Sequence, residues 1–240
     1  MISRIEKGSL AEELELAAGD KILKINGKTP LDIIDLSFLM AEEEIELLIE
    51  HSDGEQEIIA FEKDIDEELG AEFESAVFDG IRRCKNHCVF CFIDMIAPNM
   101  RRTLNIKDDD YRLSFLFGNF ITLTNLTAKD FRRIKKYHLS PLFVSIHAMN
   151  PELRAKMLRT PLGAKINSQL DELEKAGVEY HMQVVLCRNL SRKISRRFRT
   201  NFCLFRRRIL FARGKKSAAR RVLRRLSANR KRNRHDAQLY

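Results

Sequence analysis

The chain has 240 residues, 44% of them hydrophobic, which suffices for one medium-sized domain or two small ones with a real core. No stretch approaches the ~20 consecutive apolar residues of a transmembrane helix, and the N-terminal segment lacks the apolar core of a signal peptide. These features argue against a membrane protein and predict a cytoplasmic one. Five cysteines, three of them clustered, suit metal binding in a reducing compartment better than a disulfide framework.

The net charge of +9 is an average over two unlike regions. Residues 188–240 contain 20 of the 43 basic residues but one of the 34 acidic residues, Asp236. Residues 1–187 therefore hold more acidic than basic side chains. The change of composition at about residue 188 separates a mildly acidic protein from a strongly basic tail.

Residues 1–65 are predicted to form a small α+β domain. Ser9 and Glu12 have the spacing of a capping box and predict a short helix through Leu16. Residues 22–25 predict a strand that is followed by a tight Asn26-Gly27 turn, and a second helix is expected from Thr29-Pro30. Residues 45–51 and 57–63 predict a hairpin across Asp53-Gly54.

Residues 66–187 show alternating strand and helix patterns. Strands are predicted at 73–81, 112–117, 141–148 and 178–187. Helices are predicted at 127–138, opened by Thr127 and Asp130, at 150–158 and at 166–177. Repeated β–α units of this length predict a parallel sheet with right-handed crossovers.

Cys84, Cys88 and Cys91 have the spacing C-x3-C-x2-C. Three thiolates on one loop can hold a cubane iron–sulfur cluster and leave one of its irons open for a ligand from outside the protein. The same cysteines could instead form a structural zinc site, with His87 or Cys187 as the fourth ligand. The spacing alone leaves both kinds of site open.

The cysteine spacing, with Phe90 before the last cysteine, resembles the cluster loop of radical S-adenosylmethionine (radical SAM) enzymes. The runs FCFIDMIAPNMR, KDDDYRLSFLFGNFITLTNL, LSPLFVSIHAM and HMQVVLC, in this order, resemble bacterial radical SAM proteins with an N-terminal PDZ-like domain, described as Fe–S oxidoreductases of unassigned substrate. The resemblance covers about residues 1–187. It implies a (β/α)6 barrel, here partial and truncated, preceded by the small α+β PDZ-like domain.

The resemblance also implies the cofactors. Cys84, Cys88 and Cys91 are expected to ligate a [4Fe-4S] cluster, and Phe90 to lie near the adenine of S-adenosylmethionine. A one-electron reductant such as a flavodoxin or ferredoxin is the expected partner. Reductive cleavage would give a 5′-deoxyadenosyl radical that attacks an unknown substrate, through catalytic residues that also remain unknown.

Other candidate cofactor-binding residues lie at strand ends. Gly118 and Asn119 stand where related enzymes carry a Gly-Gly-Glu-like segment that meets the methionine amino group, although the acid is absent here. Ser145 and His147 alternate on the third predicted strand, so both are expected to face the barrel interior.

On the fourth predicted strand, His181 and Gln183 alternate in the same way, and Gln183 is a candidate contact to the cofactor. The three aspartates 108–110 are interpreted as a solvated turn. Cys187 and Cys203 are interpreted as residues that bind no metal.

The run GDKILKING, residues 19–27, resembles bacterial PDZ domains. Such domains capture a peptide C-terminus by strand addition. The Gly-rich carboxylate-binding loop has no evident counterpart here, so we expect a packing role in preference to peptide binding.

The basic tail, residues 188–240, has three interpretations: a nucleic-acid-binding arm, a disordered extension, or translation out of frame. We favour the last, because the composition changes in the middle of the expected barrel. The fourth strand would then have an unpaired edge, and the chain would be inactive, aggregate or bind RNA non-specifically. Two alternative functions follow from the same features: a non-enzymatic zinc- and nucleic-acid-binding protein, or a PDZ-type interaction module.

Overall fold

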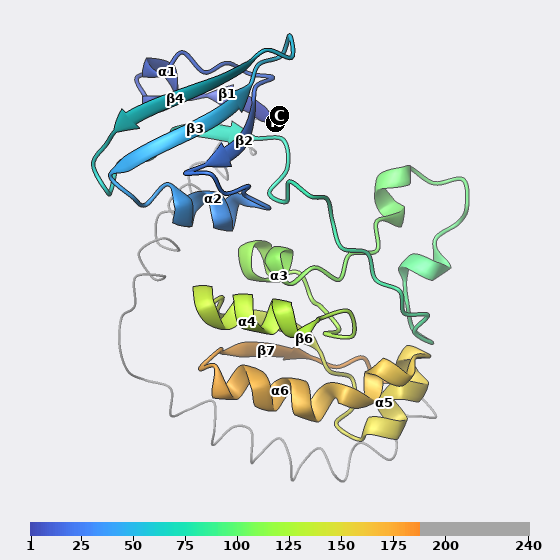
Figure 1. The fold of residues 1–240 in the computed structure, drawn as a ribbon. Helices are drawn as coiled ribbons and strands as arrows, with labels where there is room; N and C mark the ends of the chain where they lie inside the picture. The colour runs from blue at the N-terminus through green and yellow to red at the C-terminus, as the bar shows by residue number, and fades with distance from the viewer. Residues whose placement is uncertain (188–240) are drawn as a thin grey trace. The chain divides into compact units, whose positions relative to one another are not determined.

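The computed structural model describes residues 1–187, which divide between two compact units (Figure 1). The first unit comprises Met1–Arg82, and the second begins at Arg83, so residues 66–82 group with the first unit. Within the described part of the chain, no helix is long and apolar enough to cross a membrane. The interpretation of residues 188–240 as a basic, disordered or out-of-frame tail lies outside the described residues.

The first unit is built mainly from antiparallel strands. Its elements are β1 (Ile2–Ile5), α1 (Leu10–Glu13), β2 (Lys21–Ile25), α2 (Ile33–Leu39), β3 (Glu44–Glu50), β4 (Gln56–Glu62) and β5 (Ala71–Phe73). Strands β2, β3 and β4 form one antiparallel sheet in that order, and β1 pairs with β5 in a second one. The hairpin predicted across Asp53-Gly54 is confirmed as β3–β4.

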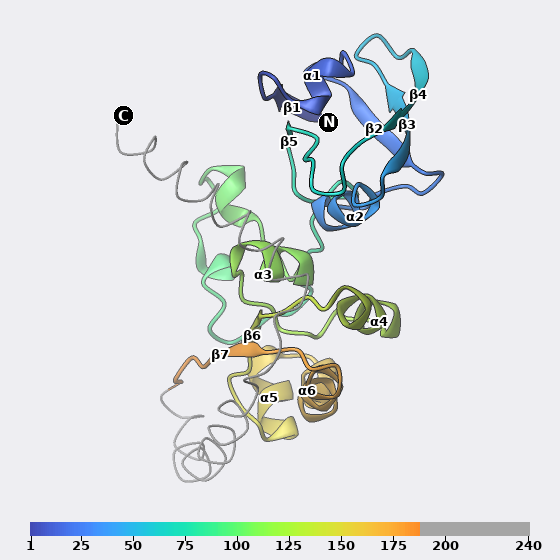
Figure 2. The same cartoon turned by 90° about the vertical axis from the view of Figure 1, so that its left-hand side faces the viewer.

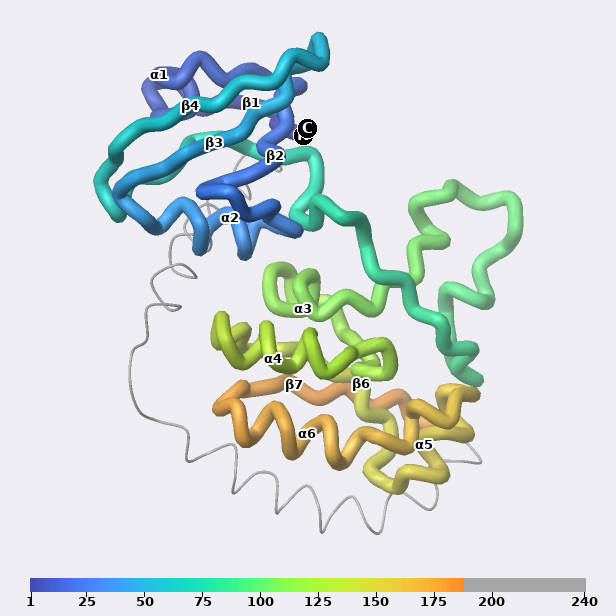
Figure 3. The backbone as a smooth tube through the Cα atoms, in the orientation of Figure 1, coloured from blue at the N-terminus to red at the C-terminus, as the bar shows by residue number. Residues whose placement is uncertain are grey.

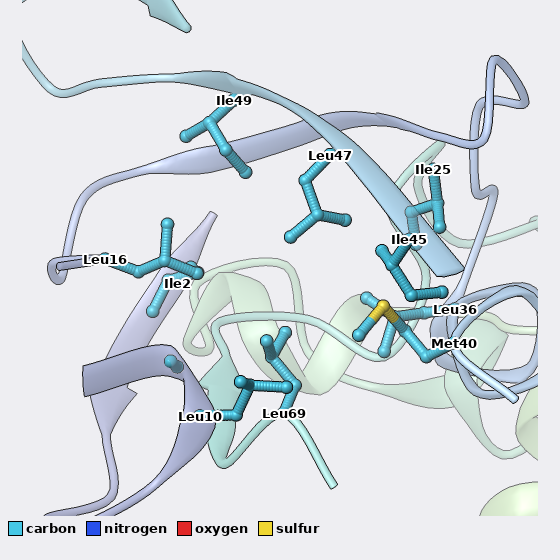
Figure 4. Close-up of a cluster of buried hydrophobic side chains, with 11 residues drawn as sticks. Ile2, Leu10, Leu16, Ile25, Leu36, Met40, Ile45, Leu47, Ile49 and Leu69 are labelled. Atoms are coloured by element: carbon cyan, nitrogen blue, oxygen red, sulfur yellow. The ribbon is translucent and has the colours of Figure 1, made fainter. Parts of the chain in front are cut away.

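The core of the first unit lies on one face of the β2–β3–β4 sheet. Ile45, Leu47 and Ile49 alternate with exposed or half-buried residues along β3, as a strand with one buried face requires. They pack with residues from both helices and from the flanking segments (Figure 4): Ile2, Leu10, Leu16, Ile25, Leu36, Met40 and Leu69. Burial of this apolar surface supplies the main force that holds the unit together.

The two helices and the tight turn predicted for the first unit are present, but the bounds of both helices differ from the prediction. Ser9 Oγ accepts a hydrogen bond from the Glu12 N–H, but α1 ends at Glu13 instead of Leu16. The Asn26-Gly27 turn is present, with positive φ at both residues. Helix α2 begins at Ile33 and not at Pro30, because the Asp32 carboxylate accepts from two N–H groups of the first turn.

The second unit contains a parallel β–α–β segment. Its elements are η1 (Ile93–Met95), η2 (Arg102–Asn105), α3 (Tyr111–Phe117), α4 (Ala128–Tyr137), β6 (Leu142–Ser145), α5 (Pro151–Leu158), η3 (Pro161–Lys165), α6 (Ile166–Lys175) and β7 (Tyr180–Gln183). Strands β6 and β7 lie side by side and pair in parallel, with Phe143 opposite His181 and Ser145 opposite Gln183 (Figure 2). Ile121 adds a parallel bridge to Val144 on the other edge of β6.

Three helices of the second unit follow the prediction closely. Thr127 and Asp130 form a complete capping box at α4, and Asn150 caps α5, which has Pro151 in its first turn. Helix α6 is followed by Gly177, which has a positive φ. In Figure 3, residues 92–106 form a long loop that projects from the helices and strands of the second unit. This loop contains η1 and η2.

The strand predicted at 73–81 does not belong to the parallel sheet. Residues 71–73 form β5 and pair with β1, and Val77 bridges to Asp32. The apolar residues of this segment pack in the first unit, where the ring centroids of Phe73 and Phe78 lie 5.3 Å apart.

The strand predicted at 112–117 is also wrong, because these residues form helix α3. The Asp110 carboxylate accepts from the Arg112 N–H at the start of α3, and Gly118 ends it in the left-handed conformation. The position next to β6 is taken instead by Ile121, three residues after Gly118. The described residues thus form a mixed α/β structure, and the partial (β/α)6 barrel stays a prediction.

We predict that His51 makes the stability of the first unit depend on pH. Its ring nitrogens lie 3.2 Å from Asp20 Oδ2 and 3.3 Å from Glu57 Oε2, and the hydrogen bond with Glu57, followed by Asp20, raises the His51 pKa against an opposing effect of desolvation. A raised folded-state pKa stabilises the fold fully below an unfolded pKa of about 6.5, and this contribution is lost as the pH rises through the folded value. His51→Gln should therefore lower the melting temperature more at pH 5.5 than at pH 9; an equal loss at both would contradict the prediction.

Candidate metal and cofactor site

The cysteine loop, residues 84–91, is attached to the second unit through its backbone. The Cys84 N–H donates to the Lys107 carbonyl at 2.7 Å, next to the bridge between Arg83 and Asp108. The Val89 N–H donates to the Met157 carbonyl, at the end of α5, at 3.0 Å. Both halves of the loop are thus held by segments that are distant in the sequence.

The three thiols are half-buried and free. Burial is the main cause that raises the pKa of Cys84 to about 12 and of Cys88 to about 11. Cys88 adds to the rise at Cys84, and Cys91 adds to the rise at Cys88, so the thiols lie near one another. Among residues 1–187, however, no three His, Cys, Asp or Glu side chains are already gathered into a metal site. The donor chemistry fits an iron–sulfur cluster, and the final geometry requires the loop to close around it.

Asn86 of the loop belongs to a buried polar cluster, which also contains Asp109, Thr122 and Thr124. Asn86 Nδ2 donates to the hydroxyls of Thr122 and Thr124, each at 2.9 Å. The Asp109 carboxylate accepts from the Thr122 N–H at 2.6 Å and from its hydroxyl at 2.7 Å. Burial raises the pKa of Asp109, and these hydrogen bonds from Thr122 oppose the rise.

Arg154 of α5 is fully buried and holds three segments of backbone together. Its guanidinium donates to the carbonyl oxygens of Thr122 (2.8 Å), Ser145 (2.9 Å), Ile146 (2.8 Å) and Gly163 (3.0 Å). Burial lowers its pKa to about 10, against the opposing effects of Asp109 and Cys88. Arg154 therefore remains charged at neutral pH, and the field of that charge reaches the cysteine loop.

Two predicted cofactor residues, Phe90 and His147, lie together. Their ring centroids are 4.4 Å apart, which brings the cysteine loop against the segment that follows β6. His147 has a φ of 60°, and its Nδ1 accepts from the Val185 N–H at 3.2 Å. Burial, assisted by Arg154, lowers its pKa to about 4. The imidazole is therefore neutral at pH 7 and carries its proton on Nε2.

The other predicted residues form separate pairs. Ser145 Oγ donates to Gln183 Oε1 at 3.3 Å across β6 and β7. Gly118 packs beside the ring of Phe143, and Asn119 Nδ2 donates to Asp108 Oδ2 at 2.9 Å. Within residues 1–187 no hydrogen bond joins Gly118 or Asn119 directly to the cysteine loop.

The interpretation of residues 108–110 as a solvated turn is wrong. Asp109 and Asp110 are buried: Asp109 belongs to the polar cluster, and Asp110 forms a buried ion pair with Arg112, 2.7 Å between its Oδ2 and the Nη2 of Arg112. A charged side chain is buried at little cost only where such partners are present, and a sequence does not reveal them.

Sequence reasoning also missed the remaining members of this region. Thr122 and Thr124 alternate in the run FITLTN, a period of two that indicates a strand, and this signal was available. Asn86 and Arg154 carried no distinguishing signal, because each follows an ordinary polar pattern in its loop or helix.

The comparisons with known families agree with this architecture. A Radical SAM-like domain matches residues 63–197, which is more than half of the chain, and a PDZ domain matches residues 1–51. The protein therefore belongs to the radical SAM-like family. More particularly, it is a member of that family that carries an N-terminal PDZ domain, as the sequence predicted. No curated protein and no solved structure matches the chain.

We predict that Arg154→Leu destabilises the second unit strongly. The substitution removes the Arg154 hydrogen bonds from four buried carbonyl groups, of which Ile146 keeps the bond from the Ala148 N–H, so the free energy of unfolding should fall by about 3 kcal/mol. Urea denaturation of the full chain measures this change. Lys156→Ala, an exposed position on the same helix, is the matched control and should have little effect. Similar small effects of both variants would contradict the proposed importance of the guanidinium.

Proposed function

We propose that this protein is a radical SAM enzyme that binds a [4Fe-4S] cluster through Cys84, Cys88 and Cys91 and cleaves S-adenosylmethionine. The observation that carries the proposal is a family match that includes a loop with three free, half-buried thiols. When bound, the reduced cluster would supply one electron to cleave S-adenosylmethionine into methionine and a 5′-deoxyadenosyl radical. The substrate that loses a hydrogen atom to this radical is unassigned.

The position of the cysteine loop supports this function. Asn86 contacts Thr122 and Thr124, which follow Ile121, and Phe90 contacts His147, which follows β6. Because Ile121, β6 and β7 run in parallel, these contacts lie at the carboxyl ends of the strands. In parallel α/β proteins, this edge of the sheet is the usual place for a cofactor or substrate.

The chain's own residues suit the binding of a polar adenosyl cofactor. We propose that the neutral His147 offers its Nε2–H as a donor, held in orientation by Val185 and Phe90. The Ser145–Gln183 pair offers hydroxyl and amide groups without net charge. Phe90 lies between the second and third cysteines of the loop, with its ring against His147. Gly118 and Asn119 are weaker candidates, since their contacts are with Phe143 and Asp108.

The alternative function, a zinc-binding protein without catalysis, predicts a different metal. The fourth ligand would be His87, whose side chain is 77% exposed and 3.9 Å from Asp94, or Cys187, which packs against the Ala148–Met157 cluster. A closed zinc site has four protein ligands. Metal content therefore separates the two functions.

We expect anaerobic reconstitution with iron and sulfide to give about four irons and four sulfides per chain. Cys84→Ser, Cys88→Ser and Cys91→Ser should each lose most of this iron, because each removes one ligand. Cys187→Ser is the matched control and should retain it. Iron and sulfide assays, with the EPR spectrum after dithionite reduction, provide the measurement. Stoichiometric zinc that depends on Cys187, with no cluster signal, would support the zinc alternative.

We expect the reconstituted and reduced protein to convert S-adenosylmethionine into 5′-deoxyadenosine and methionine, which chromatography with mass detection quantifies. Cys91→Ser should reduce this conversion to the level of the protein-free control. A protein with a full complement of iron that yields no 5′-deoxyadenosine would contradict the proposed activity while leaving the cluster in place.

A further inference from the structure

Asn86 occupies the middle of the three-residue spacer between Cys84 and Cys88. Its neighbours Lys85 and His87 are exposed, whereas Asn86 is 3% exposed. Cys84 and Cys88 are half-buried on either side. The side chains of the spacer therefore alternate, and the middle one points into the protein with the flanking thiols partly covered.

Both polar atoms of the Asn86 carboxamide are hydrogen-bonded. Its Nδ2 donates to the hydroxyls of Thr122 and Thr124, and its Oδ1 accepts from the Thr124 hydroxyl at 3.1 Å. Its backbone carbonyl also accepts from Lys107 Nζ, which in turn contacts both carboxylate oxygens of Asp94. A buried group with this many partners has essentially one orientation, because any other leaves polar atoms unpaired.

The acceptors of Asn86 are themselves rigidly held. Thr122 gives its N–H and hydroxyl to Asp109, and its carbonyl accepts from Arg154. Asp109 and Arg154 thus hold the same residue at its N–H and at its carbonyl. The Thr124 N–H donates to the Thr122 hydroxyl oxygen at 3.4 Å, and the two hydroxyl oxygens lie 2.8 Å apart. The two threonines form a fixed platform at the carboxyl end of the sheet.

Between its two backbone anchors, the cysteine loop is held at Asn86, whose backbone carbonyl accepts from Lys107 Nζ and whose side chain bonds to Thr122 and Thr124. Cys84 is held through Lys107, and Val89 through Met157, but residues 85–87 lie between these points. Asn86 is the side chain that attaches this span to the sheet. Without its carboxamide, the span between Cys84 and Cys88 would keep the Lys107 contact to its backbone and lose its hydrogen bonds to Thr122 and Thr124.

We propose that Asn86 is a positioning residue that holds Cys84 and Cys88 at the spacing and orientation that the cluster requires. The inference rests on the proposed function for its purpose, but the positioning itself is a property of the metal-free protein. On this proposal, the polar cluster of Asn86, Asp109, Thr122 and Thr124 organises the cysteine loop.

The test compares the rates at which iodoacetamide alkylates each cysteine of the full-length, metal-free, reduced protein. Asn86→Asp keeps the shape of the side chain but replaces both donors by a charged acceptor, and Asn86→Ala removes the carboxamide. Loss of these buried hydrogen bonds should raise the alkylation rates of Cys84 and Cys88 about tenfold. Lys85→Ala, exposed in the same spacer, is the matched control and should react at the wild-type rate.

A second pair of variants, with smaller changes at Thr124, keeps the test decisive if the Asn86 variants fail to fold. Thr124→Val removes one hydroxyl of the platform at constant shape and should raise the alkylation rates of Cys84 and Cys88. Thr124→Ser retains the hydroxyl, so these cysteines should react at the wild-type rates. Hydrogen exchange of the amides of residues 84–89 should increase in parallel. Circular dichroism verifies that each variant is folded.

Iron uptake separates this inference from the proposed function. Faster alkylation in Asn86→Asp with reduced iron uptake supports both. Faster alkylation in a protein whose wild type takes up no iron supports the positioning role and contradicts the cluster. Wild-type alkylation and exchange rates in folded Asn86→Asp and Thr124→Val overturn the positioning role, whatever the iron content.

Discussion

The burial of the Arg154 guanidinium constrains the whole second unit. A charged group that leaves water must recover its lost hydration through hydrogen bonds, and Arg154 does so with the backbone carbonyls of four residues. These carbonyls belong to the segment after Ile121, to the end of β6 and the residue that follows it, and to η3. The guanidinium fork can reach all of them only if α5 and the strand ends keep their mutual positions.

The site inherits its geometry from this constraint. Thr122 receives the Arg154 contact at its carbonyl and presents its hydroxyl to Asn86, and Asp109 holds the same residue from the other side. The cysteine loop is therefore connected to a fully buried charge through two hydrogen bonds. His147, which follows Ile146, holds Phe90 at the other half of the loop. Such a fixed base would favour the proposed closure of the loop around a cluster, because less conformational entropy is lost when the ligands are gathered.

The two units rely on different forces. The PDZ unit has a continuous apolar core beneath an antiparallel sheet, and its contacts of His51 with Asp20 and Glu57 are close to the surface. The second unit buries several charged side chains, among them Asp109, Asp110, Arg112 and Arg154. Buried polar groups specify one arrangement strictly, since a misplaced partner leaves a charge unpaired. This strictness suits the role proposed for the second unit, the positioning of cluster ligands.

The sequence by itself determined the family, the order of the two domains, the β3–β4 hairpin and the helices α4, α5 and α6, because caps, turn residues and apolar periodicity act over a few neighbouring positions. It also identified the cysteine loop by its spacing. It failed at 73–81 and 112–117, where short apolar runs fit either a strand or a helix and where pairing with β1 or capping by Asp110 decided the outcome. Only the tertiary structure brought Asn86 to Thr122 and Thr124, and Arg154 to its four carbonyls. Such contacts join residues far apart in the chain, and the free energy of burying a polar group depends on partners that no local pattern contains.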